Sequence, residues 1–323
     1  MRPLAYTSLV ALPLLTAALP ASPASSELTP LPLVIWHGLG DDYTRSGLRQ
    51  VASLAESTNP GTYVHIIHIG DSASSDRQAT FLGNVTEQLS TVCAQLAAEP
   101  ILSTAPAINA LGFSQGGQFL RAYVERCNNP PVRNLVTFGS QHNGIFEFQA
   151  CSWGDFVCRG AEALLRVGRW SNFVQSRFVP AQYFRDPAEL GEYLENSNFL
   201  ADVNNERVLK NATYKKNLST LNRFAMFMFE DDTIVHPKES SWFAEVNTTT
   251  GEVTPLRERD IYKEDWLGLR VLDEKGALDF ETLSGEHMQL AEEDLVEVFE
   301  KYFGPVEVDL PPAQFHLVDQ EAY

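Results

Sequence analysis

Short apolar runs alternate with amphipathic stretches along most of the chain. Leu48, Val51 and Leu54 fall on one side of a helix. Phe119 and Tyr123 repeat at helical spacing further along. The pattern predicts strands at 31–38, 62–70, 105–113, 133–140 and 223–230, and helices at 46–57, 81–99 and from Gly117 onward. This alternation predicts an α/β fold with a mostly parallel central sheet flanked by helices.

One long segment, 145–222, interrupts the alternation between the last two strands. It reads as helical and holds 12 of the 34 aromatic residues of the chain, where an even spread would give about 8. One interpretation is a satellite core with its own packing. The other is a helical cap with an apolar groove above the sheet, where loops at the carboxyl ends of strands carry function. The two interpretations are compatible.

Composition limits the classes of partner that the protein can have. The 323 residues are 44% hydrophobic, which is enough for a sizeable core. With 24 basic and 42 acidic residues, the formal net charge is −18. Binding to a phosphate backbone needs a basic surface, so we expect no nucleic-acid partner.

The first 25 residues have the pattern of a secretory signal peptide. Arg2 precedes a short apolar stretch, and small residues with proline follow it at 20–25. No later stretch has the length and apolar character of a membrane span, so we expect no transmembrane segment. The sequence therefore predicts a protein of the secretory pathway.

Cysteines and glycosylation signals agree with that compartment. An even number of cysteines in a secreted chain suggests two disulfides, and three pairings are possible. The cysteine spacing matches no zinc signature, so we expect no metal site. The four cysteines are Cys93, Cys127, Cys151 and Cys158, and four Asn-x-Ser/Thr signals that could carry glycans lie at Asn84, Asn211, Asn217 and Asn247.

The stretch "GFSQG" places Ser114 between two glycines, each two positions away. It is typical of a nucleophile elbow, a sharp strand-to-helix turn that lifts a serine hydroxyl above the sheet. A glycine-rich turn without function is the alternative. A strand is predicted before the motif and an amphipathic helix after it, which is the context that an elbow requires.

A serine nucleophile needs a base and an orienting carboxylate. The strand at 223–230 runs into Asp231 and Asp232, and His287 lies in a polar loop ahead of a helix expected near Gln289. The order serine, acid, histidine is the one expected for this type of fold, although position alone does not choose between the two aspartates. His142 is the main competitor of His287. The other competing histidines are His65 and His68 inside a strand, His236 close to the acid loop, and His316 near the C-terminus.

The serine chemistry also needs two N–H donors for the oxyanion. The N–H of Gln115, directly after the nucleophile, is the first candidate. The second is the N–H of Leu39 in "HGLGDD", which follows the first strand. His37 and Gly38 in that stretch could equally reflect a tight turn that needs glycine.

Several longer stretches carry a resemblance to a known family. These are "GFSQGGQFLRAYVERC", "WHGLGD", "FLADVNNER", "YKKNL", "DDTIVHP", "SWF", "LGL" and "GEHMQL". In this order, between about residues 31 and 303, they resemble the lysosomal palmitoyl-protein thioesterase family (type 1) of the α/β-hydrolase superfamily. The resemblance implies hydrolysis of the thioester between a long-chain fatty acyl group and a protein cysteine. It implies a lysosomal, vacuolar or secreted enzyme that needs no cofactor and acts on S-acylated proteins or peptides and on long-chain fatty acyl thioesters.

The resemblance also assigns residues and boundaries. It implies a hydrolase domain at 26–304, an acyl-binding cap at 145–222, and a tail at 305–323 that could be disordered. The implied site comprises Ser114, Asp232 and His287, with Leu39 and Gln115 as oxyanion donors, and the implied disulfides are Cys93–Cys127 and Cys151–Cys158.

The chain departs from the family at one loop. Asp42, Tyr43 and Thr44 stand where the family can have an adjacent cysteine pair, which removes a tether but leaves the mechanism intact. Two rival functions remain open: an oxygen-ester lipase or esterase with the same three residues, and a non-catalytic α/β-hydrolase that binds lipids.

Overall fold

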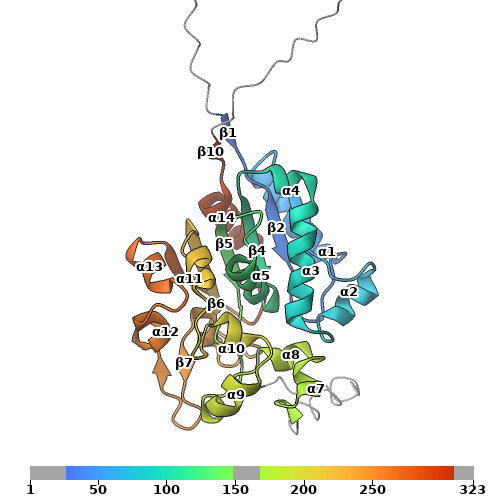
Figure 1. Cartoon of the computed structure of the whole chain (residues 1–323). Coiled ribbons are helices and arrows are strands. Elements are labelled where there is room, and N and C mark those ends of the chain that lie inside the picture. Colours follow the sequence, from blue (N-terminus) through green and yellow to red (C-terminus); the bar gives the residue numbers. More distant parts are fainter. Residues whose placement is uncertain (1–26, 148–167, 309–323) are drawn as a thin grey trace, which may run out of the picture. The chain divides into compact units, whose positions relative to one another are not determined.

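The central feature of the computed structural model is a six-stranded sheet (Figure 1). The structure describes residues 27–147 and 168–308. Neighbouring strands follow the order β3-β2-β4-β5-β6-β9, and every pair is parallel. The strands are β2 (Leu33–Trp36), β3 (Val64–Ile66), β4 (Ile108–Phe113), β5 (Val132–Phe138), β6 (Arg223–Phe229) and β9 (Leu278–Leu283). The predicted α/β class with a mostly parallel sheet is confirmed.

The strand order changes direction next to β2. The chain passes from β2 to β3 on one side and then returns to place β4 on the other side. Loops that follow β2 and β4 therefore diverge, and such a switch point leaves a crevice at the carboxyl ends of the strands. Trp36 at the end of β2 lies opposite Gly112 near the end of β4, so both loops begin at the same level.

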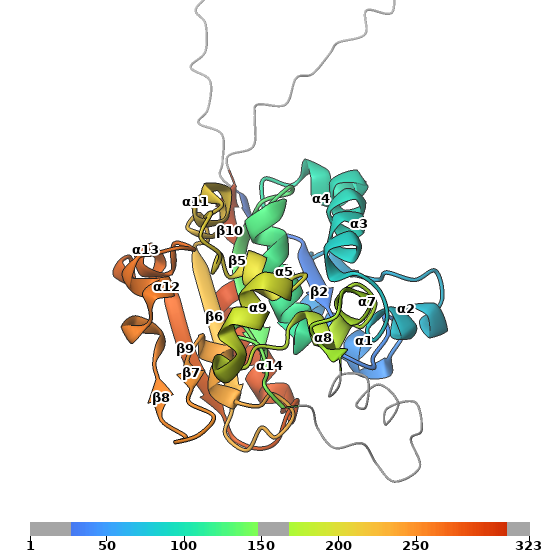
Figure 2. The same cartoon turned by 60° about the horizontal axis from the view of Figure 1, so that its bottom comes forward.

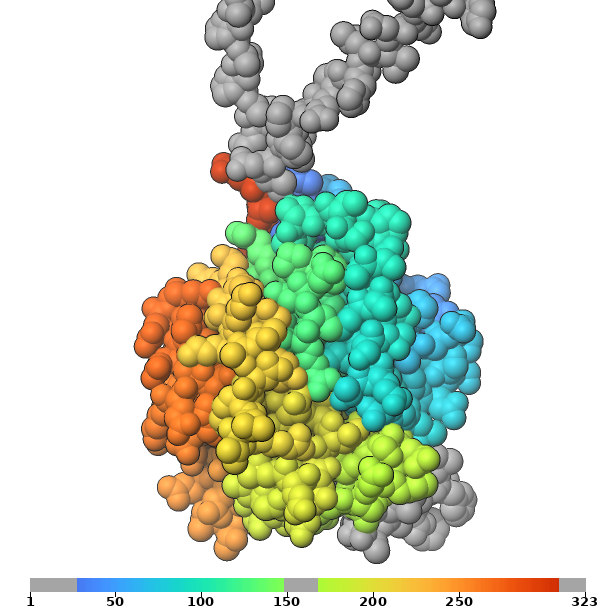
Figure 3. All heavy atoms as spheres, viewed as in Figure 1, coloured from blue at the N-terminus to red at the C-terminus, as the bar shows by residue number. Residues whose placement is uncertain are grey.

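Helices cover both faces of the sheet, because side chains of alternate parity point to opposite faces. Val34 and Ala110 share one core with α3 (Val85–Ala98) and α5 (Gln115–Arg126). Ile35 and Leu111 share the other core with α1 (Ser46–Thr58) and α14 (Glu292–Phe303). On the face seen in Figure 3, the segments of α3, α5 and α11 (Ala212–Leu218) lie side by side.

Most predicted elements differ from the structure by a few residues at their ends, and two differ most. The helix expected at 81–99 begins only at Val85, because the Asn84 side chain accepts hydrogen bonds from the N–H groups of Thr86 and Glu87 and so caps it. The strand expected at 62–70 has only three residues, Val64–Ile66. The apolar run that predicted the longer strand continues after Ile66, where the chain has already left the sheet.

The segment between β5 and β6 contains several short helices. Figure 2, which brings this end of the sheet forward, shows α7 (Asn172–Gln175), α8 (Val179–Gln182) and α9 (Leu190–Asn196) in front of the strands. Phe199 contacts Phe119 of α5 edge-on at 5.5 Å between ring centroids. Among the described residues of this segment, four buried aromatic side chains join the core of the sheet: Tyr183, Tyr193, Phe199 and Tyr214. Val174 and Ala181 form a small separate cluster with Phe178.

The remaining elements are short. They are α2 (Ala73–Ala79), α4 (Pro100–Thr104), α10 (Leu200–Val203), α12 (Asp260–Lys263), α13 (Leu269–Glu274), the hairpin of β7 (Glu245–Val246) with β8 (Val253–Thr254), and three 3-10 helices, Pro187–Glu189, Lys238–Trp242 and Leu256–Glu258. β1 (Glu27–Thr29) and β10 (Val306–Val308) form a two-stranded sheet.

A disulfide joins α3 to the end of α5. It links Cys93 to Cys127, with their Cα atoms 6.1 Å apart. Cys151 and Cys158, the expected leader at 1–25 and most of the expected tail lie outside the described residues. Within 27–147 and 168–308, no helix combines the length and apolar character needed to cross a membrane.

Candidate active site

Ser114 occupies the turn between β4 and α5 in a conformation that side-chain-bearing residues rarely adopt. Its φ is 52° and its ψ is −124°. The glycines of the motif make this turn possible. A Cβ on Gly112 would lie 2.2 Å from the Cα of Gly117, and a Cβ on Gly116 would lie 2.3 Å from the carbonyl oxygen of Trp36. The strained backbone therefore holds the serine hydroxyl at the carboxyl edge of the sheet.

Three side chains from three strand ends meet at this turn. The Nε2 atom of His287, which follows β9, lies 3.2 Å from the Oγ atom of Ser114. The Nδ1 atom of His287 lies 2.7 Å from Oδ2 of Asp232, which follows β6. The strands of a parallel sheet bring the loops at their carboxyl ends to one edge, so residues 173 positions apart can share a hydrogen bond.

The two candidate aspartates have different surroundings. Asp232 is buried, and its Oδ1 atom accepts hydrogen bonds from the N–H groups of Ile234 and Val235, each 2.9 Å long. Asp231 is exposed, and its N–H donates to the carbonyl of Gly285 over 3.0 Å. The structure thus brings Asp232 to the histidine and leaves the Asp231 side chain in solvent.

Of the two expected oxyanion donors, Gln115 directly follows Ser114, and Leu39 follows a residue that lies against the serine. Gln115 is the first residue of α5, where N–H groups have no partner within the helix and the helix dipole favours a negative charge. Among the described residues, none accepts a hydrogen bond from the N–H of Leu39 or of Gln115. A Cβ on Gly38 would lie 3.0 Å from the Cβ of Ser114, so the loop after β2 rests directly against the serine.

His37, one residue before this glycine, belongs to a second histidine–aspartate pair. Its Nε2 atom lies 2.8 Å from Oδ2 of Asp76 on α2, and the two side chains are 2% and 0% exposed. Burial opposes a charge on His37, but the hydrogen bond and the charge of Asp76 raise its pKa above the usual value. Burial likewise disfavours a charged Asp76, yet its hydrogen bonds with His37 and Ile69 lower its pKa. No motif in the sequence marks Asp76.

The competing histidines do not reach Ser114 in the described structure. His142 is fully buried, with Nε2 3.0 Å from Oγ1 of Thr137 and Nδ1 accepting a hydrogen bond from Arg121. Burial and the charge of Arg121 lower its pKa well below the usual value. The others lie elsewhere: His65 in β3, His68 beside Tyr43, His236 next to Glu147, and His316 outside the described residues.

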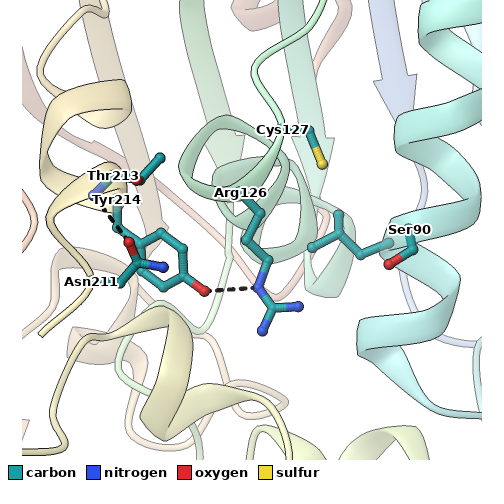
Figure 4. A pocket seen from close by; sticks show the side chains of 7 residues that line it. Ser90, Arg126, Cys127, Asn211, Thr213 and Tyr214 are labelled. Atoms are coloured by element: carbon teal, nitrogen blue, oxygen red, sulfur yellow. Dashed lines mark hydrogen bonds between the residues drawn. The ribbon is translucent and has the colours of Figure 1, made fainter. Parts of the chain in front are cut away.

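A polar pocket of about 440 Å³ lies at the other end of α5. Twelve helical residues separate it from Ser114, a distance of about 18 Å. In Figure 4, the Arg126 guanidinium points into the pocket and donates to the Tyr214 hydroxyl. Arg126 is also paired with Asp202. The pocket is lined by Leu89, Ser90, Arg126, Cys127, Asn211, Thr213 and Tyr214, a set without a nucleophile and base in contact.

The four glycosylation signals differ in the state of their side-chain amides. Asn84, Asn211 and Asn247 use their oxygen to cap following N–H groups, which leaves the amide nitrogen without an acceptor among the described residues. Asn217 instead donates this nitrogen to the carbonyl of Glu125 over 3.0 Å. Within the described ranges, no cluster of three His, Cys, Asp or Glu residues could hold a metal ion.

Comparison with known proteins shows the family to which the chain belongs. The family described as palmitoyl protein thioesterase matches residues 32–287. Palmitoyl-protein thioesterase 1 of Caenorhabditis elegans is 40% identical over 280 residues, which are 84% of this chain and 92% of that protein. Palmitoyl-protein thioesterase 3 of Dictyostelium discoideum is 36% identical over 266 residues, 81% of this chain and 87% of that protein. A solved structure of the RedJ thioesterase of Streptomyces coelicolor is 14% identical with a TM-score of 0.41, over 88% of this chain and 96% of that chain. The chain described here belongs to the palmitoyl protein thioesterase family.

Proposed function

We propose that this protein hydrolyses the thioester between a long-chain fatty acyl group and a protein cysteine, with Ser114 as nucleophile. The observation that carries the proposal is the continuous contact from Ser114 through His287 to Asp232, over 3.2 and 2.7 Å. Nucleophile, base and orienting acid in hydrogen-bonding order are the arrangement that activates a serine. Membership of the family supports the thioester as substrate.

The first half of the reaction makes an acyl-enzyme. As Oγ of Ser114 attacks the thioester carbonyl carbon, its proton passes to Nε2 of His287, and Asp232 stabilises the resulting imidazolium. The carbonyl oxygen becomes an oxyanion, which the N–H groups of Leu39 and Gln115 bind. When the tetrahedral intermediate collapses, the carbon–sulfur bond breaks and the cysteine sulfur leaves, taking the proton held by His287.

The second half releases the fatty acid. A water molecule gives a proton to His287 and attacks the acyl carbon, the same N–H groups bind the new oxyanion, and Ser114 regains its proton as the ester bond breaks. A thiol is a good leaving group, so its protonation matters less than it does for an amide. Positioning and the oxyanion donors therefore supply most of the acceleration.

The acyl chain is expected to bind beneath the segment 145–222. Leu39, in the loop after β2, and Phe81 and Leu82, which follow α2, are 40%, 38% and 41% exposed, and Phe81 lies beside Gly40 of the same loop. Phe178 pairs with Leu82 through a β-bridge, which joins the described part of the segment to this apolar edge. Each buried methylene contributes about 0.8 kcal/mol, so such a surface selects long chains.

The expected compartment is the secretory pathway, ending in a lysosome, a vacuole or the medium. The pattern at 1–25, the disulfide and the three glycosylation signals with free amide nitrogens support this route. One relative, of which 86% is covered at 28% identity, is named lysosomal thioesterase PPT2 in Homo sapiens.

The test is turnover of an S-palmitoylated peptide by the purified protein. Ser114→Ala should reduce kcat by about 10⁴-fold or more and abolish labelling by a fluorophosphonate. Labelling that persists in Ser114→Ala would refute the nucleophile assignment. A matched peptide with an O-palmitoyl serine in place of the S-palmitoyl cysteine distinguishes a thioesterase from an oxygen-ester esterase. Faster turnover of this ester than of the thioester would indicate the esterase.

A further inference from the structure

Asp76 receives hydrogen bonds from two separate loops. Its Oδ2 atom accepts from Nε2 of His37 over 2.8 Å and from the N–H of Tyr43 over 3.0 Å. Its Oδ1 atom accepts from the N–H groups of Ile69 and Gly70 over 2.7 and 3.3 Å. A buried carboxylate is stable only when it is paired and fully hydrogen-bonded, and this one uses the loops after β2 and β3 as its donors.

The surroundings of His37 favour its protonated form. Its second ring nitrogen, Nδ1, lies 3.2 Å from the carbonyl oxygen of Gly38. Both nitrogens therefore face acceptors, and an imidazole can donate from both only when it is protonated. The contact with Asp76 is thus a buried, charge-assisted hydrogen bond, which is stronger than a neutral one.

The anchors of this loop lie on both sides of Leu39. His37 is held two residues before it, and the N–H of Gly40 donates to Oγ1 of Thr80 over 2.9 Å directly after it. Four residues after Leu39, the N–H of Tyr43 donates a hydrogen bond to Asp76. The loop is therefore fixed around an N–H group that has no acceptor among the described residues.

We propose that His37 and Asp76 are positioning residues for the reaction. Their ion pair holds residues 37–43 so that the N–H of Leu39 meets the developing oxyanion. The inference rests on the proposed function, since an oxyanion forms only when Ser114 attacks an acyl group. Preorganised donors act only within tight geometric limits, so a loosened loop weakens transition-state binding without removing any group that touches the substrate.

Asp76→Asn tests the idea, because it keeps the size of the side chain and removes its charge and half of its acceptors. The matched control is Asp265→Asn, since Asp265 is also buried, is paired with Lys215 at 2.7 Å, and accepts from the N–H of Arg270. His37→Gln is the conservative variant, because its amide N–H can still reach Asp76. It also provides the same comparison if Asp76→Asn does not fold.

The readouts are kcat and KM on a palmitoyl thioester, together with the affinity for two ligands. Hexadecylboronic acid adds to a serine oxygen as a tetrahedral anion, whereas hexadecanol measures chain binding alone. We expect Asp76→Asn to lower kcat and boronate affinity by about 10-fold to 100-fold, with KM and hexadecanol affinity within about threefold. His37→Gln should lose less, and Asp265→Asn should keep kcat within about twofold even where its melting temperature falls.

An unchanged kcat in Asp76→Asn, or an equal loss of boronate and hexadecanol affinity, would overturn the positioning role. A wild-type protein that binds the boronate but leaves the palmitoyl thioester intact would instead count against the proposed substrate. The boronate-to-hexadecanol ratio would then still report on the two residues.

Discussion

Two histidine–aspartate pairs lie on either side of Ser114, and they have similar geometry. The ring nitrogen of His287 is 2.7 Å from Asp232, and that of His37 is 2.8 Å from Asp76. In both pairs the aspartate side chain is 0% exposed. The second ring nitrogens differ, because that of His287 faces the Ser114 hydroxyl and that of His37 faces a backbone carbonyl.

This difference decides what each pair can do. A hydroxyl can give up a proton, so a histidine that faces it can act as a base. A carbonyl can only accept, so a position between a carbonyl and a carboxylate favours a protonated histidine, which holds the chain in place. His287 is also more accessible, at 11% exposure against 2% for His37.

The largest expected effect separates the two histidines. His287→Ala removes the base and should lower kcat by about 10⁴-fold to 10⁶-fold, whereas His37→Ala should lower it by about 10-fold to 100-fold. Steady-state kinetics on a palmitoyl thioester would measure both. Equal losses in the two variants would mean that the pairs do not have distinct roles.

The next effect separates the two neighbouring aspartates. Asp232→Asn leaves His287 without its carboxylate and should reduce kcat by about 10⁴-fold. Asp231→Asn alters an exposed side chain and should stay within about twofold. The same assay applies, and comparable losses at both positions would contradict the choice of Asp232.

The sequence predicted one of the two pairs and missed the other for a physical reason. Ser114 follows a predicted strand and His287 precedes a helix expected near Gln289, in the order that the chemistry requires, so their positions could be inferred. Asp76 acts through loop N–H groups that become neighbours only when β2 and β3 pair, and no local pattern reports this. Position along the chain also left Asp231 and Asp232 open, because which of them turns toward the histidine depends on the turn after β6.

Five of the six strands of the sheet were predicted, but β9 (Leu278–Leu283) was missed, and the ends of the predicted elements were inaccurate. The cap formed by Asn84 fixes the start of α3 four residues later than its apolar pattern suggests. The segment 145–222 was expected to be helical and aromatic-rich, but its packing against α5 depends on contacts far apart in the sequence. Because of such contacts, Phe199 of this segment packs in the same core as the helix α5.

Substitution of a glycine beside His287 offers a smaller perturbation of the His287–Asp232 pair. Gly139 has a φ of +51°, and a Cβ on it would lie 3.0 Å from Cε1 of His287 and 2.9 Å from Cε of Met288. Gly139→Ala should therefore displace the imidazole and lower kcat by about 10-fold to 100-fold. Gly251→Ala is the matched control, since Gly251 has a φ of +72° and open space around its Cβ position. Kinetics and melting temperatures of both variants separate displacement from backbone strain, and an equal kcat in the two would refute the displacement.

The smallest expected effect is a change in how stability depends on pH. Burial opposes the charge on His37, but Asp76 outweighs it and raises the pKa of the folded state above the usual value. The pair therefore stabilises the fold fully below the unfolded pKa of about 6.5, and this contribution is lost as the pH rises through the raised pKa. Urea unfolding at pH 5.5 and 8.5 should show a larger drop in the free energy of unfolding for the wild type than for His37→Gln, which cannot titrate at this position. The same drop in both proteins would mean that His37 is not the charged partner of Asp76. The two histidine–aspartate pairs would then not differ in the charge of their histidines.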